Sequence, residues 1–104
     1  MKRPVQWSRD ALEDFKQQID YIAADNPTAA RRVAERIDAT ATALGALATG
    51  RPGRVAGTYE KPIARLPFII AYAITPTAGG EVISILRVIQ GARDWPRDSW
   101  PAET

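Results

Sequence analysis

Two long apolar segments near the end of this 104-residue chain constrain its fold more than any other feature. Residues 68–74 read Phe-Ile-Ile-Ala-Tyr-Ala-Ile, and residues 81–89 read Glu-Val-Ile-Ser-Ile-Leu-Arg-Val-Ile. A turn rich in threonine and glycine, residues 75–80, separates them. β-Branched and aromatic residues at this density predict a hairpin of two central strands. Because both strands are apolar on both faces, both faces of the sheet are expected to be covered.

The first half of the chain predicts an antiparallel pair of helices. Ser8 is suited to cap the first helix, and Pro27, preceded by Asp25-Asn26, is suited to the first position of the second. The apolar positions of the first helix recur every three or four residues: Leu12, Phe15, Ile19 and Ile22. Those of the second keep this spacing until Gly50 and Pro52: Ala30, Val33, Ile37, Leu44 and Leu47. Each stripe predicts one buried helix face.

Two shorter segments complete the expected order of elements. Residues 3–7 alternate and predict a strand with Val5 and Trp7 on one face. Residues 58–61 alternate after a glycine-rich turn, and Pro62 suits a sheet edge or a bulge. The order β-α-α-β-β-β predicts an α+β fold in which a helical hairpin packs on a small twisted antiparallel sheet. A single domain spanning residues 1–104 is expected for this length.

One helical hairpin can cover only one face of this sheet. The second face, or the outer groove between helices and sheet, is therefore a candidate for burial by another chain. The alternative is that the turns and the C-terminal tail cover the second face. The sequence favours neither interpretation over the other.

Composition excludes several kinds of chemistry. The chain has no cysteine and no histidine, which removes thiol nucleophiles, imidazole bases and the common zinc ligands. The pair Gly79-Gly80 lacks the strand-to-helix context of a phosphate-binding loop, so no catalytic residue, cofactor or metal is expected.

The opening Met1-Lys2-Arg3-Pro4 provides no apolar signal segment, and no apolar run reaches the roughly 18 residues that span a bilayer. A cytoplasmic protein without membrane insertion is expected.

Arginine is the residue type with most functional potential. Arg87 lies within an apolar strand, Arg93 follows that strand beside Trp95, and Arg65 lies in an earlier loop. Arginine next to aromatic rings suits recognition of phosphates, carboxylates or stacked rings. A structural arginine, held by carbonyl groups or by a carboxylate such as Asp94, is the alternative for Arg87. The net charge of +2 is weak evidence for nucleic acid.

The segment from Ile85 to Pro96, Ile-Leu-Arg-Val-Ile-Gln-Gly-Ala-Arg-Asp-Trp-Pro, resembles the closing motif of the ParE/RelE superfamily of toxin–antitoxin toxins. Three earlier segments resemble the superfamily pattern in the same order: Asp25 to Ala30, Gly53 to Glu60, and Phe68 to Tyr72. The resemblance covers nearly the whole chain. It implies a helical hairpin packed on a twisted sheet, and a cognate antitoxin that wraps a flexible segment around the toxin.

The resemblance also implies a choice between two branches. The RelE branch resembles ribosome-dependent mRNA endonucleases, whereas the ParE branch is associated with poisoning DNA gyrase. The nucleases place basic residues on the strand that carries Glu60 and Pro62 here, and an arginine where this chain has Ile69. They also carry a tyrosine or histidine shortly after the closing motif. At that place this chain has Asp98-Ser99-Trp100, with neither residue type. Of the nuclease set only Arg93 is matched.

The resemblance therefore implies a ParE-like toxin that inhibits gyrase by binding and is not an enzyme. A RelE-like endonuclease, or an inactive toxin that retains antitoxin binding, are the alternatives. Target-binding candidates lie on the closing strand and its surroundings: Arg65, Arg87, Gln90, Arg93 and Trp95. Antitoxin-binding candidates lie on helix and sheet: Leu12, Phe15, Tyr59, Phe68, Ile70 and Tyr72. The expected partners are a ParD-like antitoxin, in a hetero-oligomer, and gyrase, with DNA reached only through the antitoxin.

Overall fold

The computed structural model describes residues 2–90, so the candidates Arg93 and Trp95 lie outside the described residues. Its elements are β1 (Val5–Trp7), α1 (Arg9–Ala23), α2 (Pro27–Ala46), β2 (Arg51–Pro52), β3 (Tyr59–Pro62), β4 (Phe68–Thr77) and β5 (Gly80–Gln90). The α+β class and the order of the predicted elements are confirmed. The two-residue strand β2 was not predicted, because its residues Arg51 and Pro52 carry no strand pattern. Within residues 2–90 no helix has the length and apolar character to cross a bilayer.

Both helices begin where their capping residues predict. The Ser8 hydroxyl accepts a hydrogen bond from the Ala11 amide at 3.0 Å. The Asn26 side chain accepts one from the Ala29 amide at 3.0 Å, and Pro27 occupies the first turn of α2. These side chains satisfy amide groups that have no partner within the helix itself. The start of each helix is therefore fixed by local sequence.

The end of α2 differs from the expectation. The helix stops at Ala46, and Leu47 adopts an extended backbone with φ −150° and ψ 108°. Leu44 is buried in the core, whereas Leu47 is 69% exposed. The prediction that Leu47 continues the buried stripe was wrong, because the chain leaves the helical path one residue earlier.

The sheet has the order β1-β5-β4-β3-β2, so the first and last strands are neighbours. The contacts among β2, β3, β4 and β5 are antiparallel, as predicted. β1 instead runs parallel to β5, with Val5 opposite Ile83 and Trp7 opposite Ile85, which makes the sheet mixed. Because of this direction the chain runs along β5 toward its C-terminal end. There the backbone amide of Ser8 donates to the Ile85 carbonyl at 2.9 Å, and α1 begins.

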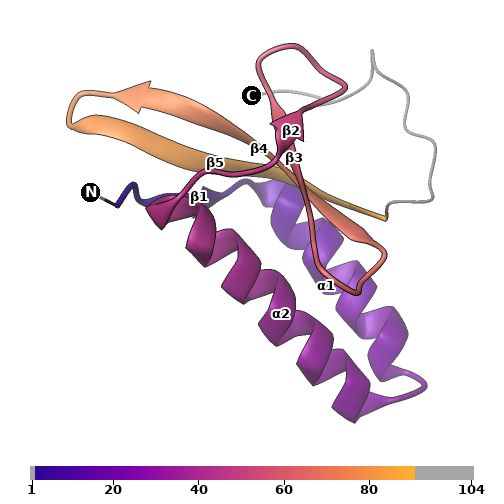
Figure 1. Cartoon of the computed structure of the whole chain (residues 1–104). Coiled ribbons are helices and arrows are strands. Elements are labelled where there is room, and N and C mark those ends of the chain that lie inside the picture. Colours follow the sequence, from indigo (N-terminus) through magenta and orange to yellow (C-terminus); the bar gives the residue numbers. More distant parts are fainter. Residues whose placement is uncertain (1, 91–104) are drawn as a thin grey trace.

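The β4–β5 hairpin is longer than predicted. The two strands pair from Phe68 opposite Gln90 to Thr77 opposite Gly80, which leaves a short turn at the tip. Figure 1 shows this hairpin projecting beyond the rest of the sheet. Threonines in the expected turn join the strands, because the Thr75 and Ser84 hydroxyls bond across the hairpin at 2.9 Å.

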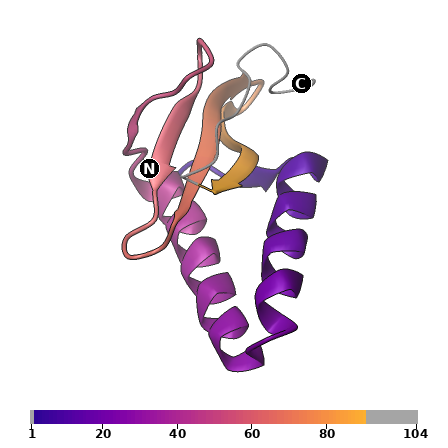
Figure 2. The same cartoon turned by 90° about the vertical axis from the view of Figure 1, so that its right-hand side faces the viewer.

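The main core lies between the helical hairpin and one face of the sheet. Both helices lie on the same side of the sheet (Figures 1 and 2). The buried core residues come from both layers: Ala11, Ile37, Ala41, Leu44, Ile63, Phe68, Ile70, Tyr72, Ile83, Ile85 and Val88. Burying these side chains supplies most of the hydrophobic stabilisation. The expectation that one helical hairpin covers one sheet face is confirmed.

Candidate functional site

The second face of the sheet is partly covered by the turn between β2 and β3. Ile69, Ala71 and Ile89 form a small buried cluster on this face, and Val55 of the turn packs against it. The turn is held by the Thr58 hydroxyl, which donates to the Val55 carbonyl at 2.6 Å. Part of this face is thus covered by the chain's own turn, which was one of the two interpretations of the sequence.

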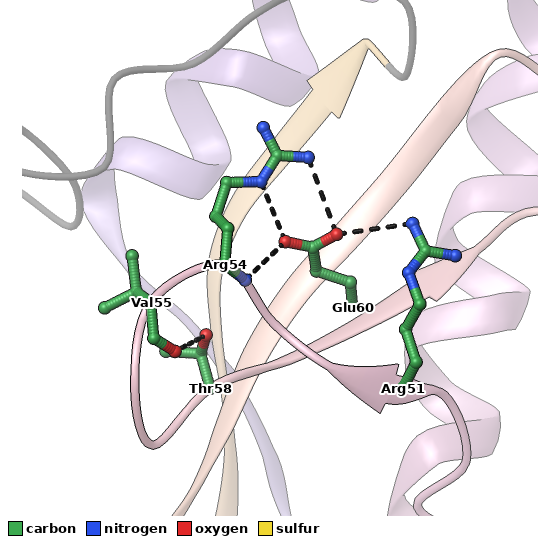
Figure 3. A network of polar contacts seen from close by, with 5 residues as sticks. All are labelled: Arg51, Arg54, Val55, Thr58 and Glu60. Atoms are coloured by element: carbon green, nitrogen blue, oxygen red, sulfur yellow. Dashed lines mark hydrogen bonds and ion pairs between the residues drawn. The ribbon is translucent and has the colours of Figure 1, made fainter.

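A buried carboxylate anchors this turn (Figure 3). Glu60 lies on β3 opposite Ala71 and is 3% exposed. Its carboxylate accepts hydrogen bonds from the Arg54 amide at 3.0 Å and from Arg54 Nε at 2.9 Å. Arg51, on β2, donates to the same carboxylate at 3.3 Å. Charge-assisted bonds of this kind are stronger than neutral ones and fix the turn over the sheet.

The environment of Glu60 changes its acidity. Burial alone would raise the pKa of Glu60, but the hydrogen bonds from Arg54 and the charges of Arg54 and Arg51 outweigh it. The pKa therefore lies below its ordinary value. The pKa of Glu60 is lower in the folded chain than in the unfolded chain, where it is about 4.3. The ionised carboxylate therefore stabilises the fold at pH values above this unfolded pKa. This stabilisation is lost as the pH falls through the folded value.

Glu60→Gln should therefore destabilise the chain in a pH-dependent way. At pH 7 we expect the free energy of unfolding to fall by about 2 kcal/mol, because charge-assisted bonds are lost. The difference from the unsubstituted chain should shrink as the pH falls toward the lowered pKa of folded Glu60, because its carboxylate then becomes protonated. Urea denaturation followed by circular dichroism between pH 3 and 7 measures both values. Glu35→Gln, at an exposed position of α2, is the control, and an equal pH dependence in both variants would contradict the role of Glu60.

A groove of about 970 Å³ continues beyond this turn on the second face. The turn residues Val55 and Thr58 form one wall, and Ser8 and Asp10 at the start of α1 form the other. Ala73, Thr75, Ser84 and Leu86 from β4 and β5 also line it. This part of the second face is left open by the elements within residues 2–90.

Arg87 is held by α1. Its Nε and terminal nitrogen donate to the two carboxylate oxygens of Asp14 at 2.7 and 3.0 Å. The Val88 amide donates to Asp14 at 3.0 Å as well. The hydrogen bond with Asp14 is the main reason that the pKa of Arg87 lies above its ordinary value. Of the two interpretations of Arg87, this bidentate pair supports the structural one, with Asp14 as its carboxylate; Asp94 lies outside the described residues.

Asp14 also acts at the free side of β5. β1 pairs with β5 only as far as Ile85, so the amide of Val88 would otherwise face outward. A β-bulge lies here, because Ala71 pairs with Arg87 and Tyr72 with Ile85, which leaves Leu86 unpaired. Bulges redirect side chains from one face of a strand to the other. Sequence reasoning missed Asp14 because nothing local links it to a strand more than 70 residues away.

The other described target candidates lie at one end of the sheet. Gln90 ends β5 opposite Phe68, and Arg65 lies in the preceding β3–β4 turn. Arg65 has a positive φ of 67° and is exposed. Arg65 and Gln90 thus share the end of the sheet from which the chain continues toward residue 91, whereas Arg87 points to α1.

The antitoxin candidates divide into surface and core residues. Leu12 and Tyr59 are 52% and 38% exposed. Phe15 is partly buried and meets Trp7 edge-to-face at 5.6 Å. The remaining three candidates face the chain's own helices and are at most 5% exposed: Phe68, Ile70 and Tyr72. These three belong to the core of this chain, so any effect they have on a partner would be indirect.

The comparisons with known proteins agree with this architecture. The family model of the ParE toxin of type II toxin-antitoxin systems, parDE, matches residues 5–95. The chain belongs to the ParE toxin family. A curated relative in Sinorhizobium fredii (strain NBRC 101917 / NGR234), named "Putative toxin Y4kP", is 35% identical over 97 residues, covering 92% of this chain and 96% of the relative.

A solved structure also resembles this ParE-family toxin. It is that of the chromosomal ParDE TA system from P. aeruginosa, with a TM-score of 0.76 and 25% sequence identity. The likeness covers 86% of this chain and 96% of the solved chain. The family assignment made from the closing motif is thereby confirmed, together with the role of a type II toxin.

Proposed function

We propose that this ParE-family toxin acts by binding DNA gyrase, and that a ParD-like antitoxin neutralises it in a hetero-oligomer. The family match and the similarity to a ParDE system support an antitoxin partner. The toxin works by recognition, without turnover of a substrate. Gln90, at the end of β5, and Arg65, in the β3–β4 turn at the same end of the sheet, are the described residues proposed to contact gyrase.

The observation that carries this proposal is the pairing of the Glu60 carboxylate with Arg54 and Arg51. The resemblance implies that ribonucleases of the superfamily hold basic residues on this strand. Here the strand presents a carboxylate whose oxygens are engaged by Arg54 and Arg51. Ile69, where the nucleases have an arginine, is buried beneath Val55. RNA cleavage requires groups that activate the 2′-hydroxyl and stabilise the charged phosphate, so this arrangement favours binding over cleavage.

A supercoiling assay tests this function. Purified toxin added to gyrase and relaxed plasmid is expected to block supercoiling or to trap cleaved DNA, and adding the antitoxin should restore normal supercoiling. Normal supercoiling at saturating toxin would contradict the proposal. Cuts in mRNA on translating ribosomes would instead indicate the RelE-like activity. Unchanged growth on expression without antitoxin would indicate an inactive toxin.

A further inference from the structure

A second groove runs along the outer side of α2, away from the core. Its volume is about 480 Å³. One wall is a helical stripe in which positions recur every three or four residues, and the opposite wall comes from β3 and the turn after it. The residues that carry the argument are Arg36, Ala39 and Ala43 on α2, Leu47 directly after it, and Lys61 and Ala64 across from them.

The apolar part of this groove is open to solvent. Ala39 and Ala43 are exposed small residues on the helix surface, so a partner chain can approach closely. Leu47 closes one end of the groove and is 69% exposed, because the helix ends just before it. A large aliphatic side chain left in water beside an apolar groove is typical of a contact surface.

The charged part of the groove is entirely basic. Arg36 and Lys61 contribute the charges, and among residues 2–90 no aspartate or glutamate lines the groove. Arg36 donates to the Ala64 carbonyl at 3.1 Å, and within residues 2–90 neither cation forms an ion pair. Arg32, one turn earlier on the exposed side of α2, extends the basic end. Charge complementarity therefore favours an acidic partner.

We propose that this groove binds an acidic segment of the antitoxin that carries an aliphatic side chain at one end; the inference rests on the proposed function. Carboxylates of the segment face Arg36 and Lys61, and its aliphatic side chain packs on Leu47 and Ala43. The distance from Arg36 to Leu47 along the helix is about 16 Å. Roughly five residues of an extended chain, or about eleven of a helix, cover this distance.

Binding of the antitoxin to groove variants tests the inference. The probe is the small protein that co-purifies with this toxin, which is then purified separately and titrated into the full-length toxin by calorimetry. Ala43→Arg fills the groove and Leu47→Asp removes its anchor, so each should weaken binding at least about tenfold. Tyr21→Asp is the control, since Tyr21 is 82% exposed on α1 and lies outside the groove. It should change affinity less than about twofold.

Charge reversal tests the acidic character of the partner. Lys61→Glu should weaken binding and reduce its dependence on salt, because a complementary pair becomes repulsive. Thermal melts must show that each variant is folded. Unchanged affinity in all three groove variants would overturn the inference and leave the proposed function intact, whereas no binding by the unsubstituted toxin would contradict the proposed function itself. A concentration-dependent toxin dimer that Ala43→Arg abolishes would assign the groove to a second copy, and would also overturn the inference.

Discussion

The substitution Tyr72→Asp is expected to leave the chain unfolded, and not only unable to bind its antitoxin. Tyr72 is 1% exposed, stacks on Tyr59 at 5.5 Å, and donates a hydrogen bond to the Thr49 carbonyl at 2.6 Å. Burial and the neighbouring Tyr59 raise its pKa, so the hydroxyl stays neutral at pH 7. Losing a buried aromatic ring costs about 3–5 kcal/mol, and an unpaired buried carboxylate costs several more. This sum matches the whole stability of a typical domain, roughly 5–15 kcal/mol.

Two variants separate folding from binding at this position. Tyr72→Phe removes only the hydrogen bond to Thr49 and should cost about 1 kcal/mol with a native circular dichroism spectrum. Tyr59→Asp alters the partly exposed ring of the stacked pair, so the chain should remain folded and report directly on antitoxin contact. A cooperative, native-like melt of Tyr72→Asp would show that Tyr72 is not in the core.

The substitution Asp14→Ala is expected to lower the free energy of unfolding by about 3 kcal/mol, because breaking a largely buried ion pair leaves its partner uncompensated. The Asp14 and Arg87 side chains are 12% and 18% exposed. The change also removes the acceptor for the Val88 amide. Urea denaturation of the purified chain measures the loss.

Asp20→Ala is the matched control, on the same helix. Asp20 pairs with Lys16 at 3.4 Å, but both side chains are more than 60% exposed. Exposed pairs of this kind contribute about 0.3–0.5 kcal/mol, so this variant should melt almost as the unsubstituted chain does. Equal losses in the two variants would contradict a special role for Asp14.

The parts of the fold that depend on neighbouring residues could be predicted from the sequence. Ser8 and Pro27 start their helices through contacts within a few residues, and strand pairs follow from the apolar segments. The end of α2 could not be predicted in this way. Leu47 keeps the helical spacing, and only the extended path of the chain after Ala46 takes it out of the core.

The candidate site was less predictable, since its contacts join distant residues. Two-sided apolar strands do not say which face the chain covers itself, so Phe68 and Ile70 were expected at an interface although they pack on the helices. Glu60 was noted as a departure from the nuclease pattern, but its burial was not foreseen. Basic residues six and nine positions before it were the available signal, and they pair with it only because β2 lies beside β3.

The placement of β5 between β1 and β4 also bears on how the chain is made. The ribosome synthesises β1 and both helices long before β5, yet β1 has no strand partner until Ile83 donates to the Pro4 carbonyl at 2.8 Å. Pairings between distant segments form late and slow the folding reaction. A product cut short before β5 would lack an interior strand of the sheet and much of the surface on which the helices pack, so we expect such a product not to fold.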